Sequence, residues 1–186
     1  MKKAILLLPV FSLLISCSGG LSKTLVFSRD EIQAKVERKF PIEKMTFGTL
    51  KVILSNPDIV LDPSSDKIGL KAEVAVKPPN IGNIFGGGAE PYKGIVQIEG
   101  DVEYVPAEGK FYFTNGSVKN LDVAALPAEY KQPTLLLINE IAGDSLAKVE
   151  LMTLNEADLK ERAAKYLLKT VKVKAGKLEV MIGLGS

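Results

Sequence analysis

The side chains that could carry chemistry form few recognisable groups in this sequence. Histidine is absent and the 186 residues contain one cysteine, so the commonest acid–base group at neutral pH and most transition-metal ligand sets are missing. Glu140 and Asp144 stand one helical turn apart. They form either a carboxylate pair or, with Lys148 one turn further, a solvated row of ion pairs, which the spacing favours. We therefore predict no catalytic residue, no metal site and no cofactor.

Three other groups have structural explanations that we prefer. Asp58, Asp62 and Asp66 imitate part of a calcium loop but lack the spacing and the final glutamate of an EF-hand. The glycines at 86–88 are followed by Ala-Glu-Pro rather than the Lys-Ser/Thr of a phosphate-binding loop, so they predict a plain loop. The glycosylation sequon at 115–117 is better explained as a bend.

Cys17 has the surroundings of a modified residue. Lys2 and Lys3 precede an apolar stretch, residues 4–15, of about 12 residues, whereas a bilayer core takes roughly 20. The order Leu-Ile-Ser-Cys at 14–17 is similar to the bacterial lipobox. The similarity implies that residues 1–16 are a signal peptide and that Cys17 carries fatty acyl chains such as palmitate, which anchor the protein to a membrane. An incidental cysteine in an ordinary signal peptide is the alternative.

The rest of the chain is expected to be one domain, residues 25–186, joined to the lipidated cysteine by a tether, residues 17–24. Ser18 stands where aspartate would imply retention on the inner membrane of enterobacteria. The expected location is therefore the outer membrane, facing the periplasm. Removing residues 1–16 takes two lysines and no acid from 24 basic and 22 acidic side chains, which leaves a neutral chain. A neutral chain argues against nucleic-acid binding.

Helices and strands alternate along this domain. The capping box at 28–31 predicts a helix that ends before Pro41. Period-two alternation then predicts a long strand with a bulge at Asn56-Pro57, a turn at 62–66, and a return strand through Val76. The next expected elements are a loop at 82–94, a strand at 96–104, a turn at 106–109 and a strand from Phe111 to Val118 with a kink at Asn115-Gly116.

The C-terminal third is predicted to hold two further helices and a strand. The helix from Pro133 to Val149 is rich in apolar residues and is expected to be mostly buried. Another helix runs from Asn155 to about Lys169, and the final strand contains a bend at Ala175-Gly176.

Five segments of the chain carry a resemblance to a known family: Cys17, the helix start at 28–32, and the segments 48–52, 100–104 and 171–178. They resemble the YceB-like bacterial lipoproteins of unknown function, which look like short relatives of the tubular lipid-binding (BPI-like) superfamily. The resemblance implies an α+β fold, in which a long twisted antiparallel β-sheet wraps around a mostly buried helix, with an N-terminal helix and a C-terminal helix plus strand. In that superfamily the groove between sheet and helix holds an apolar ligand.

The candidate ligand site is the apolar face of the helix at 133–149. Its residues either fill a closed core, as apolar stripes usually do, or line a groove for a lipid. They are Leu135, Ile138, Ile141, Ala142, Leu146 and Val149.

Two functions follow from these observations, neither of them enzymatic. The first is a membrane-anchored periplasmic lipoprotein that binds a lipid or other apolar ligand in a groove between sheet and helix. The second is a structural or interaction lipoprotein with a solid core, which presents a surface to an envelope protein partner.

Overall fold

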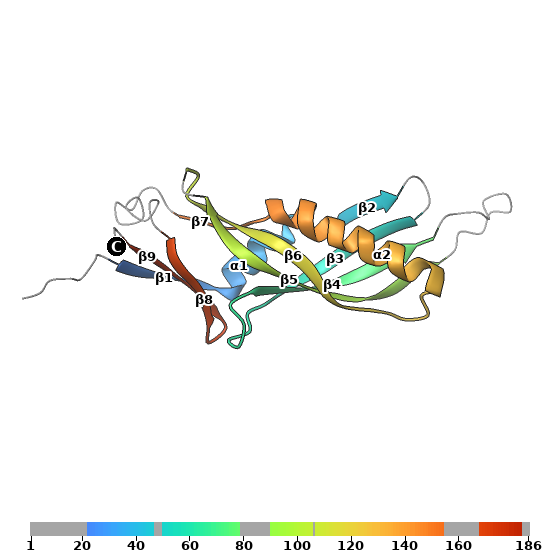
Figure 1. The fold of residues 1–186 in the computed structure, drawn as a ribbon, viewed down its shortest axis with the longest axis horizontal. Coiled ribbons are helices and arrows are strands. Elements are labelled where there is room, and N and C mark those ends of the chain that lie inside the picture. Colours follow the sequence, from blue (N-terminus) through green and yellow to red (C-terminus); the bar gives the residue numbers. More distant parts are fainter. Residues whose placement is uncertain (1–21, 47–49, 79–89, 106, 155–167, 184–186) are drawn as a thin grey trace, which may run out of the picture.

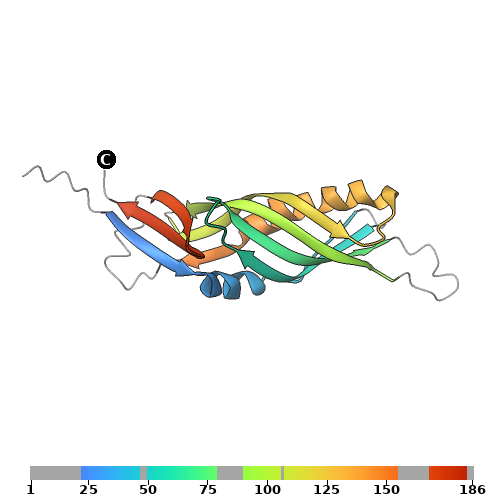
Figure 2. The same ribbon diagram turned by 90° about the horizontal axis from the view of Figure 1, so that it is seen from below.

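The described part of the chain folds into two antiparallel sheets and two α-helices (Figures 1 and 2). The computed structural model describes residues 22–46, 50–78, 90–105, 107–154 and 168–183. A six-stranded sheet has the order β2-β3-β4-β5-β6-β7, and a three-stranded sheet has the order β1-β9-β8. The molecule is elongated, and the small sheet occupies one end of it (Figure 1).

The six-stranded sheet is a curled half-barrel in which every neighbouring pair is antiparallel. Side chains alternate along its strands between the buried core and the surface; on β4, for example, Ile68, Leu70 and Ala72 are buried. The strands are β2 (Ile42–Thr46), β3 (Leu50–Val60), β4 (Ile68–Lys77), β5 (Tyr92–Val105), β6 (Lys110–Val123) and β7 (Glu150–Thr153).

The two predicted irregularities in the long strands are confirmed. The register between β3 and β4 shifts between Ser55 and Asp58, and Asn56 has a φ of 48°. The register between β5 and β6 shifts beside Asn115, whose φ is 51°. Such bulges bend a strand and increase its twist, so they contribute to the curl of the sheet.

The predicted loop at 82–94 extends too far, because β5 already begins at Tyr92. Gly94 lies within this strand, where a Cβ atom would come within 2.0 Å of the carbonyl oxygen of Asp122. The glycine therefore permits a close approach of two strands rather than marking a loop.

Helix α1 (Arg29–Glu37) begins at the predicted capping box: Ser28 Oγ accepts from the Glu31 amide, and Glu31 accepts from the Ser28 amide at 2.7 Å. The expectation of an N-terminal helix as the first element is wrong, however. The described chain opens with strand β1 (Ser22–Ser28), and α1 is a short connection between β1 and β2. Strand β1 also begins inside the range expected to be tether.

Helix α2 (Ala128–Glu140) starts five residues earlier than predicted and contains Pro133 in its interior. It continues as a π-helical turn (Ile141–Ser145) and a 3₁₀ turn (Leu146–Lys148). The expectation that this helix is mostly buried is also wrong, since one side faces the core and Leu136 on the other side is 67% exposed. An apolar stripe buries one face of a helix and does not enclose it.

The C-terminal strand of the prediction is a hairpin of two strands, β8 (Leu168–Lys174) and β9 (Lys177–Gly183), with the bend at Ala175-Gly176 as expected. Strand β9 also pairs with β1 along its whole length. Cys17, the glycines at 86–88 and most of the helix predicted at 155–169 lie outside the described residues.

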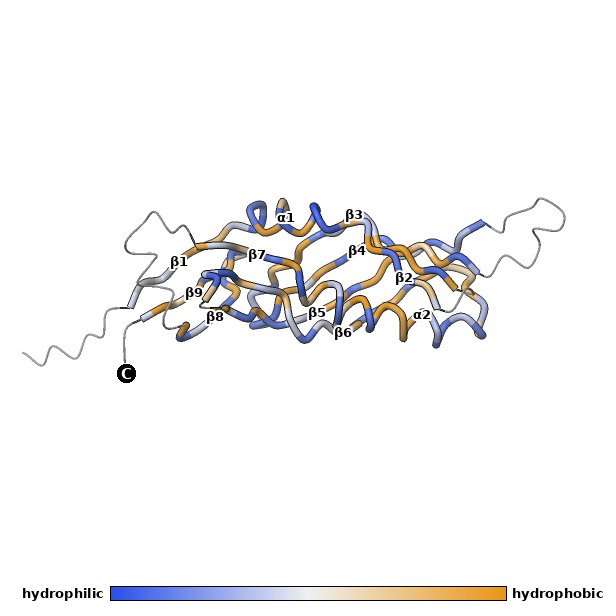
Figure 3. Tube along the Cα trace, turned by 90° about the horizontal axis from the view of Figure 1, so that it is seen from above, coloured by the Kyte–Doolittle hydropathy of each residue, from blue (hydrophilic) through white to orange (hydrophobic). Residues whose placement is uncertain are grey.

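One hydrophobic cluster joins both sheets. The ring of Phe27 on β1 lies 6.0 Å from that of Phe111 on β6, and Tyr104 on β5 lies 4.7 Å from the same ring. Bands of blue and orange along the strands in Figure 3 show the alternation of polar and apolar residues that makes this core. The small sheet is therefore packed on the large one rather than hinged to it.

Candidate functional site

Helix α2 lies along the six-stranded sheet and contacts strands from both of its sides (Figure 1). Its main neighbours are β2 and β3 on one side and β6 on the other. The helix thus spans the open side of the half-barrel, and the space between it and the sheet is filled by apolar side chains.

Five of the six predicted groove residues lie in this space and belong to the common hydrophobic cluster. Their exposed fractions do not exceed 2%, so their side chains pack against the sheet. Leu135, the sixth, is only partly buried and lies at the edge of the helix. The five buried residues are Ile138, Ile141, Ala142, Leu146 and Val149.

Thr134 is the polar residue that the sequence analysis missed. Its side chain is 0% exposed, and its hydroxyl has no hydrogen-bond partner within the described part of the chain. A buried hydroxyl without a partner costs about 1–3 kcal/mol. The sequence held a signal for it, because Thr134 stands four residues before Ile138, in the apolar stripe of α2.

The backbone of α2 is irregular over the buried face. Pro133 cannot donate the helical hydrogen bond to Glu129, and a π-helical turn replaces the α-helix from Ile141. At this turn the helix approaches β6 closely, since a Cβ atom on Gly116 would lie 2.7 Å from the carbonyl oxygen of Ala142. Gly116 therefore allows the π-helical turn to rest on the strand.

A hollow of about 410 Å³ lies between the first half of α2 and the end of β6. Asn139 links α2 to β6 through two of the residues that line it: its Oδ1 accepts from the Val118 amide at 3.2 Å, and its Nδ2 donates to the Leu135 carbonyl at 3.0 Å. Most of the hollow's side chains are apolar, with Lys131 among the charged ones. Its apolar lining is Val118, Leu121, Val123, Leu126 and Leu135.

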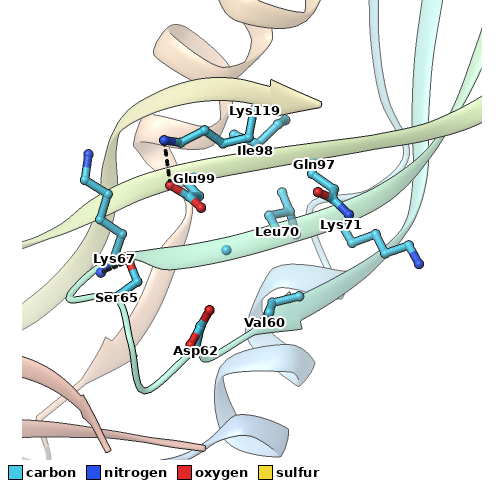
Figure 4. A pocket seen from close by; sticks show the side chains of 11 residues that line it. Val60, Asp62, Ser65, Lys67, Leu70, Lys71, Gln97, Ile98, Glu99 and Lys119 are labelled. Atoms are coloured by element: carbon cyan, nitrogen blue, oxygen red, sulfur yellow. Dashed lines mark hydrogen bonds and ion pairs between the residues drawn. The ribbon is translucent and has the colours of Figure 1, made fainter. Parts of the chain in front are cut away.

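A second hollow, of about 200 Å³, is lined by residues of β3 to β6 and of the turn between β3 and β4 (Figure 4). Several of its charged side chains are engaged in local contacts. Lys119 Nζ lies 3.0 Å from Glu99, as the dashed line in Figure 4 shows, and Asp62 accepts from the amide and hydroxyl of Ser64. This arrangement is an ordinary ion-paired surface.

Most of the carboxylates that the sequence analysis considered are engaged in structural contacts. Glu140 and Asp144 both pair with Lys44 of β2, at 3.2 and 3.3 Å, and not with Lys148 as the helical spacing predicted. Asp58 pairs with Arg29 of α1. Among the described residues, no group of three or more Asp, Glu, His or Cys side chains is placed to hold a metal ion.

No helix in the described ranges combines the length and the apolar character that crossing a bilayer requires. The sequence model of the family described as "Protein of unknown function (DUF1439)" matches residues 27–177. No curated protein matches the chain.

Proposed function

The chain belongs to the DUF1439 family, and we propose that it is a membrane-anchored lipoprotein that binds a lipid or other apolar ligand between the six-stranded sheet and α2. The finer resemblance, to YceB-like lipoproteins and the tubular lipid-binding superfamily, is part of this proposal. So are acylation of Cys17 and attachment to the outer membrane facing the periplasm.

The observation that carries the proposal is the Thr134 hydroxyl. It lies fully buried on the sheet-facing side of α2, among apolar side chains, and no described residue provides it with a hydrogen-bond partner. In an apolar core such a hydroxyl only costs free energy. A ligand with an apolar body and one polar group, such as an ester or a carboxyl, would form a hydrogen bond with it. Ligand sites commonly combine an apolar lining with a few polar groups of this kind.

The irregular hydrogen bonding of α2 supports a ligand site that opens when the helix moves. The helix covers the half-barrel, yet Pro133 and the π-helical turn remove regular hydrogen bonds from it. Beside it, the hollow along β6 gives apolar surface that is already accessible. A ligand entering there would displace α2 from the sheet rather than fill a preformed cavity.

The test is the lipid content of the protein. Residues 17–186 with Cys17→Ser, exported with an ordinary signal peptide, carry no covalent acyl chain, so any lipid extracted by organic solvent was bound. We expect near-stoichiometric lipid by mass spectrometry. Thr134→Val should lower this content at least several-fold, and Thr134→Ser, which keeps the hydroxyl, should retain it. Protein without lipid in repeated preparations would contradict the proposal.

The tight packing of the groove residues favours the second function, an interaction lipoprotein with a solid core. Under that alternative, Thr134→Val would leave both lipid content and activity in cells unchanged. Substitutions on the outer surface would instead abolish activity in cells. The same set of variants therefore separates the two functions.

A further inference from the structure

We propose that the outward face of the small sheet docks onto an anionic lipid membrane. The orientation of this face toward the membrane rests on the proposed acylation of Cys17, whereas its charge and exposure are properties of the described residues. The surface goes beyond the ligand site under α2, because it lies on another sheet and would contact lipid headgroups rather than a bound lipid.

The register of the three strands places one set of side chains on the outward face. Leu178, Val180 and Ile182 of β9 are buried, so the residues that alternate with them point outward. Three cross-strand rows result: Ser28, Lys177 and Lys174; Val26, Glu179 and Lys172; Thr24, Met181 and Thr170.

Three lysines dominate this face. Lys172, Lys174 and Lys177 are exposed, and none of them forms an ion pair or hydrogen bond with another described side chain. Glu179 is the one acidic residue among the three rows. Lysines that are not neutralised within the protein are available to anionic headgroups, and each contributes measurably to binding close to a charged surface.

The charge of the chain is divided unevenly between the small sheet and the rest of the sequence. Strands β1, β8 and β9 contain five lysines and one acid. The mature chain as a whole would have 22 basic and 22 acidic residues, so the remainder carries an excess of four acids. A neutral protein of this kind has a basic end, and an anionic surface would attract that end and repel the rest.

Two exposed apolar side chains stand among the lysines. Val26 is 52% exposed and Met181 is 39% exposed, and they occupy neighbouring rows of the same face. Basic residues around exposed apolar ones are typical of surfaces that lie in a membrane interface.

The position of the anchor brings this face to the membrane. Strand β1 begins at Ser22, five residues after Cys17, and five extended residues span at most about 18 Å. The small sheet forms the end of the molecule at which β1 begins, while α2 extends toward the opposite end (Figures 1 and 2). Docking would therefore leave the ligand site accessible from the aqueous side.

The first experiment measures vesicle binding without the anchor. Residues 17–186 with Cys17→Ser should float with vesicles of phosphatidylcholine containing 30% phosphatidylglycerol, less so as salt rises, and not with phosphatidylcholine alone. The variant K172Q/K174Q/K177Q should lose at least tenfold in binding. The control K71Q/K77Q/K93Q removes three exposed lysines from the large sheet and should stay within twofold. Equal losses in both variants would overturn the proposal.

The second experiment remains decisive if unanchored binding is too weak to detect. Cys17, the single cysteine of the chain, is coupled to a maleimide lipid in the same vesicles, and amine acetylation of each lysine is followed by mass spectrometry. Lys172, Lys174 and Lys177 should react at least threefold more slowly on anionic than on neutral vesicles, and Lys71, Lys77 and Lys93 should not. Equal rates would exclude the docking face and leave the ligand site under α2 unaffected.

Discussion

The Thr134 hydroxyl gives a prediction about stability that is separate from its proposed role in binding. Thr134→Val keeps the shape of the side chain and removes a buried hydroxyl without a partner. We expect the free energy of unfolding of the lipid-free protein to rise by about 1 kcal/mol. Urea denaturation measures it. A loss of stability would show that the hydroxyl is satisfied in solution.

Glu150 on β7 holds three elements together. Its carboxylate accepts from Lys35 of α1 and from Thr153, and lies 3.2 Å from Lys110 of β6. The hydrogen bond from Lys35, followed by that from Thr153, lowers the pKa of Glu150 from 4.5 to about 2. Charge-assisted hydrogen bonds to the ionised form produce a shift in this direction.

This shift predicts a dependence of stability on pH. Because the pKa is lower in the folded state, ionised Glu150 stabilises the fold above about pH 4.5, and that contribution is lost as the pH falls toward 2. After allowance for screening of a partly exposed group, it amounts to roughly 1–2 kcal/mol. Glu150→Gln should flatten the stability curve in this range, whereas Glu73→Gln, at an exposed site on β4, should leave it unchanged. Chemical denaturation at several pH values measures both.

At the scale of elements, the contact between β6 and the π-helical turn depends on a missing side chain. A Cβ atom on Gly116 would lie 2.7 Å from the Ala142 carbonyl and 2.8 Å from the Phe113 ring. Gly116→Ala should therefore force the turn away from the strand and lower the free energy of unfolding by roughly 2–3 kcal/mol. Thermal unfolding followed by circular dichroism measures the change.

Gly143 directly follows Ala142 and offers a control in the same π-helical turn. A Cβ atom there would meet nothing within 4 Å. Gly143→Ala is expected to be neutral or slightly stabilising. If both alanine variants behaved alike, close approach of β6 to the turn would not be what holds this part of α2 in place.

At the scale of the whole molecule, the two sheets should unfold together because they share one core. Leu178 of β9 is 0% exposed, and Leu178→Ala should cost about 2–5 kcal/mol. Met181→Ala, on the outward face of the same strand, should cost much less. In both variants a single transition is expected when far-ultraviolet circular dichroism, which reports on both sheets, is compared with tyrosine fluorescence, since no tyrosine lies in the small sheet. Two separate transitions would mean that the small sheet is an independent unit.

The local elements could be predicted from the sequence because their signals are local. The capping box at Ser28, the alternation along β3 to β6, the two strand irregularities and the bend at 175–176 each depend on residues within a few positions of one another. The apolar face of α2 was also identified, and five of its six residues are in the core.

Partnerships between distant segments were decided only by the tertiary structure. The tether expected at 17–24 takes in the first three residues of β1, and they are part of a strand because β9, some 150 residues away, pairs with them. Helix α2 was expected to be mostly buried. It lies across the open side of the half-barrel, so the sheet covers one face of the helix and leaves the other exposed. Likewise Glu140 and Asp144 form ion pairs with Lys44 rather than with Lys148, because β2 passes beside the helix.

The residues of each segment were enough to predict which faces are apolar and where helix α1 begins, and to propose which residue carries an anchor. The pairing of distant segments was needed to show that the Thr134 hydroxyl is buried with no partner among the described residues. It was also needed to show that Lys172, Lys174 and Lys177 share one outward face. The physical reason is that hydrophobic periodicity depends on neighbouring residues. Whether a polar group finds a hydrogen-bond partner, and which charges share a surface, depend on which distant strands pack together.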